Sequence, residues 1–456
     1  MAAAGSLSAQ NEAVNDTRLD LSRYFDERLE EGVYRIDRSV YTDPTLFELE
    51  MKAIFEGTWI YLAHESQLAK PHDYFTTSIG RQPIILTRGK AGNLNGFINA
   101  CSHRGALLAR LKKGNLPVLS CSYHGWCFSS DGELAFVQRQ TEGYPEHFKR
   151  SDLNLVRVPK LASYRGFIFG SLNPNVPSLE EHLAGAAPVI DMLADQSEDG
   201  IEVLKGSSTC WYRGNWKLLM DNGGGDGLHP DYTHSSLMTV LNRRNQREGQ
   251  LGSVRLDQLS KGNAKNGLYC FGNGHTLILA ELPNPEQRPV FAKKPELTQK
   301  FGPARAEWMT SRFRQIGVYP NVHIMDQLAT LIRYIRPVAV DKTEVTFWCI
   351  APKGEERSTR TKRIRQFEEF FHASGMGASD DNAEFEACQA GSMGASARWS
   401  YTSFGMHSRT VGGDEDTMSV NVPVSHHGKF GYEGQSLEQF RQWRRLLAIA
   451  NNAPAA

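Results

Sequence analysis

Two short pairs of potential metal ligands stand out in the sequence, each made of one cysteine and one histidine: Cys101 with His103, and Cys121 with His124. A glycine follows closely after each pair, which suits a tight loop because glycine accepts backbone conformations that other residues avoid. Each loop therefore offers one thiolate and one imidazole. Such mixed sulfur and nitrogen ligation is typical of a tetrahedral zinc ion or of an iron–sulfur centre.

The division of the ligands between the two loops favours the iron–sulfur centre. A structural zinc site more often takes both cysteines from one short motif and both histidines from another. In a Rieske [2Fe–2S] cluster, two cysteines hold one iron and two histidines hold the other. One cysteine and one histidine per loop fit that arrangement, so we predict a Rieske cluster at these four residues. A zinc-binding module is the alternative, and Cys127 is expected to be a small buried side chain.

A second group of residues suited to metal chemistry, Asp226, His229 and His234, follows a run of glycines. Asp226 and His229 are three residues apart and would share one face of a helix. On a regular helix, His229 and His234 would point about 140° apart. Pro230 and the glycines favour an interruption that brings both imidazoles to one metal. Two imidazoles and a carboxylate form the facial triad of non-haem Fe(II) oxygenases.

The carboxylate of that triad has two candidate sources. Asp226 is either the ligand itself or the acceptor that orients His229 through its ring N–H. The other source is the pair Asp380 and Asp381, which lies late enough in the chain to belong to a separate helix. A Rieske cluster donates one electron at a time and needs an acceptor, which favours a second iron centre at the histidine pair.

The composition excludes several classes of protein. The 456 residues include 51 Lys and Arg against 51 Asp and Glu, so the formal net charge is zero. This balance argues against a nucleic-acid binder and against a polybasic membrane-surface protein. No apolar run approaches the length of a membrane span, and the first residues lack the pattern of a secretory signal. The seven thinly spread cysteines do not form a disulfide framework, so we expect a cytoplasmic protein.

The elements that must position these residues divide the chain into three parts. Residues 1–56 form a polar arm and a helix that begins after the N-cap Asp43, and we assign both to the catalytic domain. Residues 57–170 consist of short strands and turns, which predict a small antiparallel β domain around the Rieske cluster. Residues 171–456 are mixed, and we predict a larger α+β domain that carries the mononuclear iron.

Within the larger domain, the pattern predicts one antiparallel sheet with helices around it. The expected strands are residues 276–280, 331–340 and 343–350. The expected helices are residues 179–196, broken at Pro188, and residues 215–238, 304–316, 361–372 and 437–450. The last helix carries one apolar stripe made of Leu437, Phe440, Trp443 and Leu447.

These motifs resemble the Rieske non-haem iron ring-hydroxylating oxygenases, large (α) subunit, and most closely the benzoate, anthranilate and halobenzoate 1,2-dioxygenase group. The resemblance covers most of the chain. It rests on the cluster motifs at residues 99–106 and 124–126 and on the segments 46–51, 54–57, 61–66, 80–83, 214–218, 319–321, 325–327 and 385–389. It implies a Rieske β domain inserted in a helix-grip-like catalytic domain with an antiparallel sheet.

The resemblance also assigns roles to individual residues. The iron ligands would be His229, His234 and Asp381. Asp226 then takes a bridging role in a trimer, where it links a Rieske histidine, here His124, to the iron ligand His229 of a neighbouring subunit. Asn222 matches a family asparagine near the iron.

The activity that the family implies is that of a terminal oxygenase. It would use O2 and NAD(P)H-derived electrons, received from a reductase with or without a separate ferredoxin, to dihydroxylate an aromatic ring. The substrate would be benzoate, anthranilate, salicylate or a halobenzoate, and the oligomer a homotrimer or an α3β3 assembly with a small β subunit. The alternatives are a Rieske monooxygenase, and a dioxygenase for aniline or another arene. An electron carrier without mononuclear iron is a further alternative, but it would leave most of the chain without a role.

Several residues depart from the pattern of the benzoate group. Three glycines separate Asn222 from Asp226, Leu228 replaces a common tyrosine, and Pro230, Asp231 and Tyr232 replace smaller residues. These positions are expected near the substrate pocket, so the departures concern the identity of the substrate and not the metal ligands. A buried arginine would suit the acid group of a substrate, and Arg333 and Arg336 are candidates that could equally form ion pairs.

Overall fold

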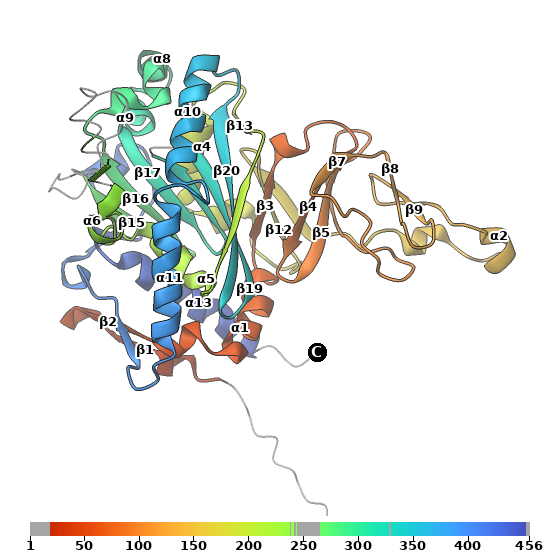
Figure 1. The fold of residues 1–456 in the computed structure, drawn as a ribbon, viewed down its shortest axis with the longest axis horizontal. Helices are drawn as coiled ribbons and strands as arrows, with labels where there is room; N and C mark the ends of the chain where they lie inside the picture. Colours follow the sequence, from red (N-terminus) through yellow and green to blue (C-terminus); the bar gives the residue numbers. More distant parts are fainter. Residues whose placement is uncertain (1–18, 238, 241–242, 244–264, 328–329, 453–456) are drawn as a thin grey trace, which may run out of the picture.

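A large antiparallel sheet forms the centre of the molecule. The computed structural model describes residues 19–237, 239–240, 243, 265–327 and 330–452 (Figure 1). The ten-stranded sheet has the order β13-β20-β19-β18-β17-β16-β15-β23-β22, with β14 pairing on β20. The bounds of its strands are β13 (Ile201–Val203), β14 (Ser208–Tyr212), β15 (Gly267–Gly272), β16 (His275–Glu281), β17 (Arg312–Val318), β18 (Val322–Asp326), β19 (Thr330–Ala339), β20 (Lys342–Pro352), β22 (Thr410–Val411) and β23 (His426–Lys429).

The sheet confirms three predicted strands and corrects one predicted helix. Strands β16, β19 and β20 match the predicted ranges 276–280, 331–340 and 343–350 to within two residues at each end. The predicted helix 304–316 is wrong in its second part, because α9 (Pro303–Ser311) ends where β17 begins. All seven residues of β17 are buried, so the strand lacks the alternation of apolar and polar positions that marks a half-exposed strand.

The predicted helix break at Pro188 is also wrong. Helices α3 (Leu179–Leu183) and α4 (Ala186–Ala194) are separated at Ala184, whose φ is +46°. Pro188 lies in the first turn of α4, where its missing N–H removes no helical hydrogen bond.

Further helices pack against the sheet and at its ends (Figure 1). They are α8 (Lys294–Phe301), α10 (Arg357–Phe370), α11 (Ala378–Ser392), α12 (Glu415–Met418) and α13 (Gly434–Asn452). α10 and α13 confirm the predicted helices 361–372 and 437–450, and the apolar stripe of α13 is buried as predicted. Within the described ranges, none of the helices combines the length and the apolar character that a membrane crossing requires.

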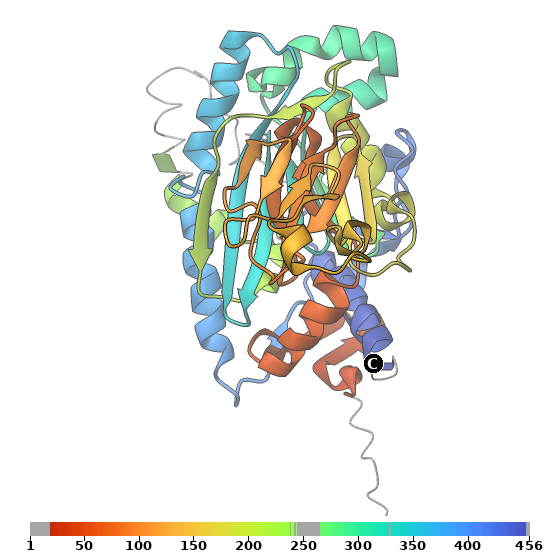
Figure 2. The same ribbon diagram turned by 90° about the vertical axis from the view of Figure 1, so that its right-hand side faces the viewer.

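A small β part projects from the large sheet (Figure 1), and Figure 2 looks onto it from its outer side. Its three sheets contain β3 (Ile60–His64), β4 (Asp73–Ile79), β5 (Gln82–Arg88), β6 (Leu94–Ile98), β7 (Lys113–Asn115), β8 (Val118–Ser120), β9 (Cys127–Ser129), β10 (Leu134–Phe136), β11 (Lys160–Tyr164) and β12 (Phe167–Ser171), with the short α2 (Gln140–Gly143) at the tip. A separate hydrophobic core surrounds Cys101, Cys121 and Trp126. The α+β fold class is thereby confirmed, while the limits 57 and 170 stay a prediction.

The N-terminal segment pairs with a distant part of the chain. Residues 19–40, expected as part of an arm, contain β1 (Phe25–Arg28) and β2 (Val33–Asp37), which form a sheet with β21 (Trp399–Tyr401). Helix α1 (Pro44–Glu50) begins, as predicted, after Asp43, whose side chain accepts a hydrogen bond from Thr45 N at 2.7 Å. Residues 1–18 lie outside the described residues.

A buried carboxylate at the end of α1 joins three helices. The side chain of Glu50 is fully buried and accepts hydrogen bonds from Trp216 Nε1 at 2.8 Å and from Trp443 Nε1 at 2.7 Å. It also pairs with the buried ammonium of Lys217 at 2.5 Å. Trp216 and Lys217 begin α5 (Trp216–Gly225), and Trp443 belongs to α13. Glu50 therefore fixes the start of the helix that leads to the second group of metal ligands.

We predict that Glu50→Ala lowers the free energy of unfolding by about 3–5 kcal/mol, because the ammonium of Lys217 would stay buried without a partner. Glu48→Ala on the same helix is the control, since its ion pair with Arg81 is exposed and contributes less than about 1 kcal/mol. Urea unfolding of the full chain measures both. Equal losses in the two variants would contradict the role of Glu50.

Candidate metal centres

The two loops at the tip of the small β part have the same backbone design. Cys101 N donates to Ala106 O at 2.9 Å, and Gly105 N donates back to Cys101 O at 2.8 Å. The same two bonds recur in the loop that begins at Cys121, at 2.8 and 3.0 Å. Gly105 and Gly125 occupy the equivalent turn with φ of +73° and +69°, which strongly favours glycine. Each loop thus presents its cysteine and its histidine in the same way.

The four predicted cluster ligands lie together. Cys101 and Cys121 are buried, and the rings of His103 and His124 are 4.5 Å apart between centroids. Trp126 stacks on His103 at 4.8 Å with an angle of 8° between the planes. Burial, followed by the nearby His124, lowers the pKa of His103, so its imidazole is neutral and able to bind a metal. Burial raises the pKa of Cys101, which a bound cation would counteract.

One polar atom in this group has no partner. Nδ1 of His103 is buried and makes no hydrogen bond, which is uncommon for an imidazole nitrogen unless it binds a metal. Two buried thiols and two adjacent imidazoles are the donor set of a Rieske cluster. The residues present therefore fit that group.

The second group of ligands is built at a helix interruption. Helix α5 ends at Gly225, Asp226 is extended, and a short helix α6 (Pro230–Thr233) follows. The interruption predicted around Pro230 is confirmed, while residue 238 of the predicted helix 215–238 lies outside the described residues. His229 and His234 stand at the two ends of α6. This geometry lets two histidines five residues apart face the same point.

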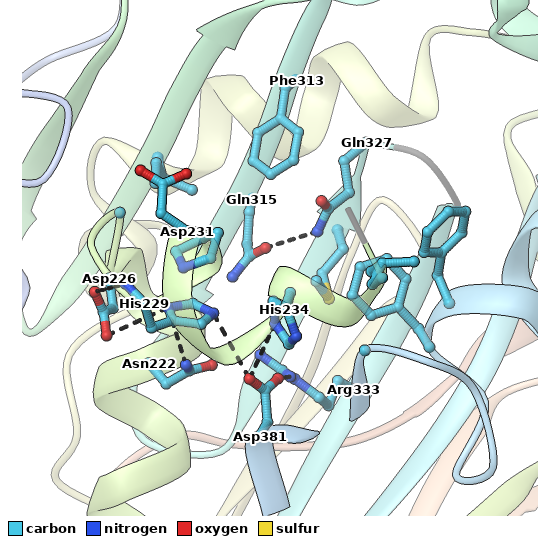
Figure 3. A pocket seen from close by; sticks show the side chains of 18 of the residues that line it. Asn222, Asp226, His229, Asp231, His234, Phe313, Gln315, Gln327, Arg333 and Asp381 are labelled. Atoms are coloured by element: carbon cyan, nitrogen blue, oxygen red, sulfur yellow. Dashed lines mark hydrogen bonds and ion pairs between the residues drawn. The ribbon is translucent and has the colours of Figure 1, made fainter. Parts of the chain in front are cut away.

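Asp381, from the first turn of α11, meets both histidines (Figure 3). Its Oδ1 lies 3.2 Å from His234 Nε2 and 3.6 Å from His229 Nε2. One ligand atom from each of the three residues lies within 4.8 Å of the others. Oδ1 of Asp381 is buried and has no hydrogen bond of acceptable geometry. Three converging atoms that can each bind a cation, one of them unsatisfied, fit a divalent metal.

A second carboxylate contacts Nδ1 of each histidine, the ring nitrogen that does not face Asp381. Nδ1 of His229 lies 3.3 Å from Asp226 Oδ2 and 3.3 Å from Asn222 Nδ2. Nδ1 of His234 lies 3.5 Å from Asp380 Oδ2. Asp226, expected to orient His229, and Asn222, expected near the iron by resemblance, both lie beside His229, whereas the sequence does not predict the position of Asp380 behind His234. Its only signal in the sequence was its place next to Asp381.

The two aspartates of α11 also control the charge of His234. Burial lowers the pKa of His234, but the contact with Asp381 and then that with Asp380 outweigh it, so the pKa is raised above its usual value. In Asp226, burial raises the pKa of the carboxyl, and the partner His229 together with two backbone N–H groups more than reverses this effect. Asp226 is therefore ionised at neutral pH.

The glycine run brings the end of α5 against the sheet. A Cβ atom on Gly223 would lie 2.1 Å from Arg333 Nη2 and 2.2 Å from His323 Cε1, and one on Gly224 would lie 2.2 Å from Gln439 Nε2. Both positions therefore require glycine for close packing. The sequence indicated these glycines only as a source of helix irregularity.

A pocket of about 810 Å³, including its mouth, opens beside the three clustered ligands (Figure 3). Apolar side chains line most of it: Leu237, Ile278, Phe313, Met325, Phe370, Phe371 and Phe430. Pro230 and Asp231 line it as expected, but Leu228 and Tyr232 do not and are exposed instead. Of the two candidate arginines, Arg333 is buried in the pocket wall, whereas Arg336 pairs with Glu344 at 2.8 Å.

A third cluster of potential ligands provides a contrast. Cys270, His426 and Glu438 also come within 4.8 Å of one another and are buried. His426, however, hydrogen-bonds Glu438 at 3.2 Å through Nε2 and the hydroxyl of Tyr432 at 3.2 Å through Nδ1. Both imidazole nitrogens are satisfied by the protein itself, so this cluster has the character of a buried hydrogen-bond network.

We predict that Gly223→Ala lowers the free energy of unfolding by about 1–3 kcal/mol, because the added methyl group meets the buried ring of His323, which hydrogen bonds to Met220 and Arg333 hold in place. Gly391→Ala in α11 is the matched control. A Cβ there meets nothing within 4 Å, and the change should be neutral or stabilise by about 0.5–1 kcal/mol. Thermal unfolding of both variants measures the difference. A Gly223→Ala variant as stable as the control would show that the close approach of α5 is not required.

Comparison with known protein families yields two matches along the chain. Residues 58–159 match the family described as Rieske [2Fe-2S] domain. Residues 190–445 match the family described as ring hydroxylating alpha subunit (catalytic domain). The two matches cover the two candidate metal centres in turn.

Curated relatives align over almost the whole chain. The 2-halobenzoate 1,2-dioxygenase large subunit of Burkholderia cepacia is 44% identical over 91% of this chain and 90% of its own length. The toluate 1,2-dioxygenase subunit alpha of Pseudomonas putida is 44% identical over 94% and 95%. The anthranilate 1,2-dioxygenase large subunit of Acinetobacter baylyi is 42% identical over 94% and 93%. Among solved structures, naphthalene 1,2-dioxygenase from Rhodococcus sp. bound to indole superimposes with a TM-score of 0.79 at 27% identity, covering 92% of this chain and 95% of that one.

Proposed function

Because this chain belongs to the ring-hydroxylating oxygenase α subunits and is a ring-hydroxylating terminal oxygenase, we propose that it dihydroxylates a benzoate-type aromatic acid with O2. The names of the relatives point to halobenzoates, toluate and anthranilate as candidate substrates, and the resemblance of the sequence adds benzoate and salicylate. NAD(P)H would supply the electrons through a reductase, with or without a separate ferredoxin. The observation that carries the proposal is an apolar pocket that ends on three converging metal-ligand side chains.

We assign the metal ligands as follows. The Rieske cluster is held by Cys101, His103, Cys121 and His124, and a mononuclear iron by His229, His234 and Asp381. When bound, the cluster supplies single electrons and the iron supplies the activation of O2. The protein orients both imidazoles through Asp226 and Asp380 and keeps the pocket largely apolar.

Arg333 is suited to bind the carboxylate of such a substrate. Its Nε donates to His323 Nδ1 at 3.1 Å, and its terminal Nη1 contacts the Asp381 carboxylate only at ion-pair distance. Its Nη1 lies 3.9 Å from Asp381 Oδ2, so a carboxylate held by Arg333 would lie beside the metal ligands. The ring carbon that bears the carboxyl group would then be close to the metal, which suits oxidation at that carbon and its neighbour.

Electron transfer is proposed to run between subunits. Within one chain, the cluster loops and α6 lie toward opposite ends of the molecule (Figure 1). Exposed apolar side chains stand near both centres: Tyr123 between the cluster ligands, and Leu228 and Tyr232 around His229. A head-to-tail trimer, with or without a small β subunit, would bury them and bring His124 of one subunit to Asp226 of the next. Asp226 would then link the two centres through hydrogen bonds to both histidines.

A second candidate substrate is an aniline. Asp231 lines the pocket with an exposed carboxylate, which would repel an aromatic acid at the mouth and attract an amine. A Rieske monooxygenase with the same two centres is the other alternative. Analysis of the products distinguishes the dihydroxylation of an aromatic acid, the oxidation of an aniline and monooxygenation.

The proposed reaction predicts that the purified enzyme, supplied with a reductase, NADH and ¹⁸O2, places both labelled oxygen atoms on one benzoate-type acid. Asp381→Ala should abolish this turnover and leave the visible absorption of the cluster unchanged, because only the mononuclear site loses a ligand. One labelled oxygen per product would favour the monooxygenase. Turnover of anilines without turnover of acids would favour the amine substrate.

Transfer between subunits predicts complementation. Cys121→Ser lacks the cluster and Asp381→Ala lacks the mononuclear site, so each variant alone should be inactive. Oligomers reassembled from an equal mixture should regain about a quarter of the wild-type rate, because one junction in four pairs an intact cluster with an intact acceptor. A mixture that stays inactive, although mass spectrometry shows mixed oligomers, would contradict transfer between subunits.

A further inference from the structure

Two glutamines form the polar part of the pocket wall that β17 and β18 build (Figure 3). Gln315 lies on β17, and Gln327 directly follows β18, the neighbouring strand. Both line the pocket, and only 8% and 5% of their surfaces are exposed. The other residues that these two strands contribute to the lining, Phe313 and Met325, are apolar. Any polar group on a substrate ring that turns toward this wall must therefore meet one of the two amides.

The direction of the hydrogen bonds in this pair is fixed by the backbone. Gln315 Nε2 lies 2.7 Å from Gly223 O. A carbonyl oxygen only accepts hydrogen bonds, so the amide nitrogen of Gln315 must face it and Oε1 of Gln315 must face the other way. Gln327 Nε2 then donates to Gln315 Oε1 at 2.7 Å. Neither amide can flip without placing two like groups against each other.

This fixed direction determines what the wall presents to a substrate. Oε1 of Gln327 is the end of this chain of hydrogen bonds, and none of the hydrogen bonds among the described residues ends on it. It is the only acceptor of the Gln327 side chain, and Gln327 lines the pocket. A substituent that cannot donate a hydrogen bond, such as methyl or halogen, would displace water from this oxygen and leave it unsatisfied. An amino or hydroxyl group would satisfy it.

We propose that Gln327, held in place by Gln315, selects aromatic substrates whose ring carries an amino or hydroxyl substituent. This inference rests on the proposed function, since it takes the pocket as the substrate site, and it narrows the substrate class. Arg333 binds the substrate carboxylate beside the proposed metal ligands, and Oε1 of Gln327 accepts a hydrogen bond from the amino or hydroxyl substituent. An aminobenzoate or hydroxybenzoate can form hydrogen bonds with both Arg333 and Gln327 Oε1, whereas benzoate and the halobenzoates can form them only with Arg333.

Equilibrium binding to the holoprotein, measured by isothermal titration calorimetry, tests the proposal. The probes are the three aminobenzoates, each compared with the methylbenzoate that carries its methyl group at the same ring position. At one position or more, the amino compound should bind about tenfold tighter or better, because methyl has a similar size but donates no hydrogen bond. Gln327→Met should reduce this preference to about twofold or less. Met325→Leu, on the same wall, should retain it.

Two results would overturn the proposal: methylbenzoates that bind as tightly as aminobenzoates at every position, or a Gln327→Met variant that keeps the preference. The first result is measured on the unsubstituted protein, so it stays decisive even if the Gln327→Met substitution disturbs folding. If none of the acids binds, the proposed acid substrate is wrong, and aniline compared with toluene then tests Gln327 without the carboxylate. Equal binding of that pair would also overturn the role of Gln327.

Discussion

The catalytic half of this structure depends on how closely α5 approaches the sheet. Gly223 and Gly224 have no side chains, so the helix rests directly on the inner strands. Thr276 donates a hydrogen bond to Gly224 O, and Gln315 donates to Gly223 O. The same helix end supplies Asn222 and leads into the turn that carries the histidines. One packing constraint thus sets the position of the proposed metal ligands and the direction of the amide pair in the pocket wall.

The balance of charges around the proposed mononuclear site favours a bound cation. Three carboxylates, those of Asp226, Asp380 and Asp381, lie against the two histidines, and Arg333 is the one guanidinium in the described pocket lining. Three negative charges against one positive charge leave an excess of two, close to what one divalent metal neutralises. Like charges this close together repel one another, so binding of a metal cation would stabilise the folded apoprotein. The opposite holds at Cys270, His426 and Glu438, where the protein satisfies its own polar groups.

The sequence predicted what is encoded within short segments. The two cluster loops, the interruption at Pro230 and the cap at Asp43 depend on neighbouring residues, and the structure has all three. Contacts between segments that are distant in the sequence are harder to predict from it. Asp381 was assigned by resemblance, and the roles of Asp380 and Gln327 went unnoticed because they follow from strand register and from the packing of α11. The sequence pattern places part of β17 in a predicted helix, because a strand that is buried on both faces shows no alternation of apolar and polar residues.

We propose that one chain holds two different iron centres. The most direct measurement is the iron and acid-labile sulfide content of protein purified without oxygen, together with the EPR spectrum after reduction by dithionite. We predict about three iron atoms and two sulfides per chain, and a rhombic signal whose average g lies below the free-electron value. Zinc without sulfide would contradict the account. So would two irons per chain that stay at two after incubation with excess Fe(II).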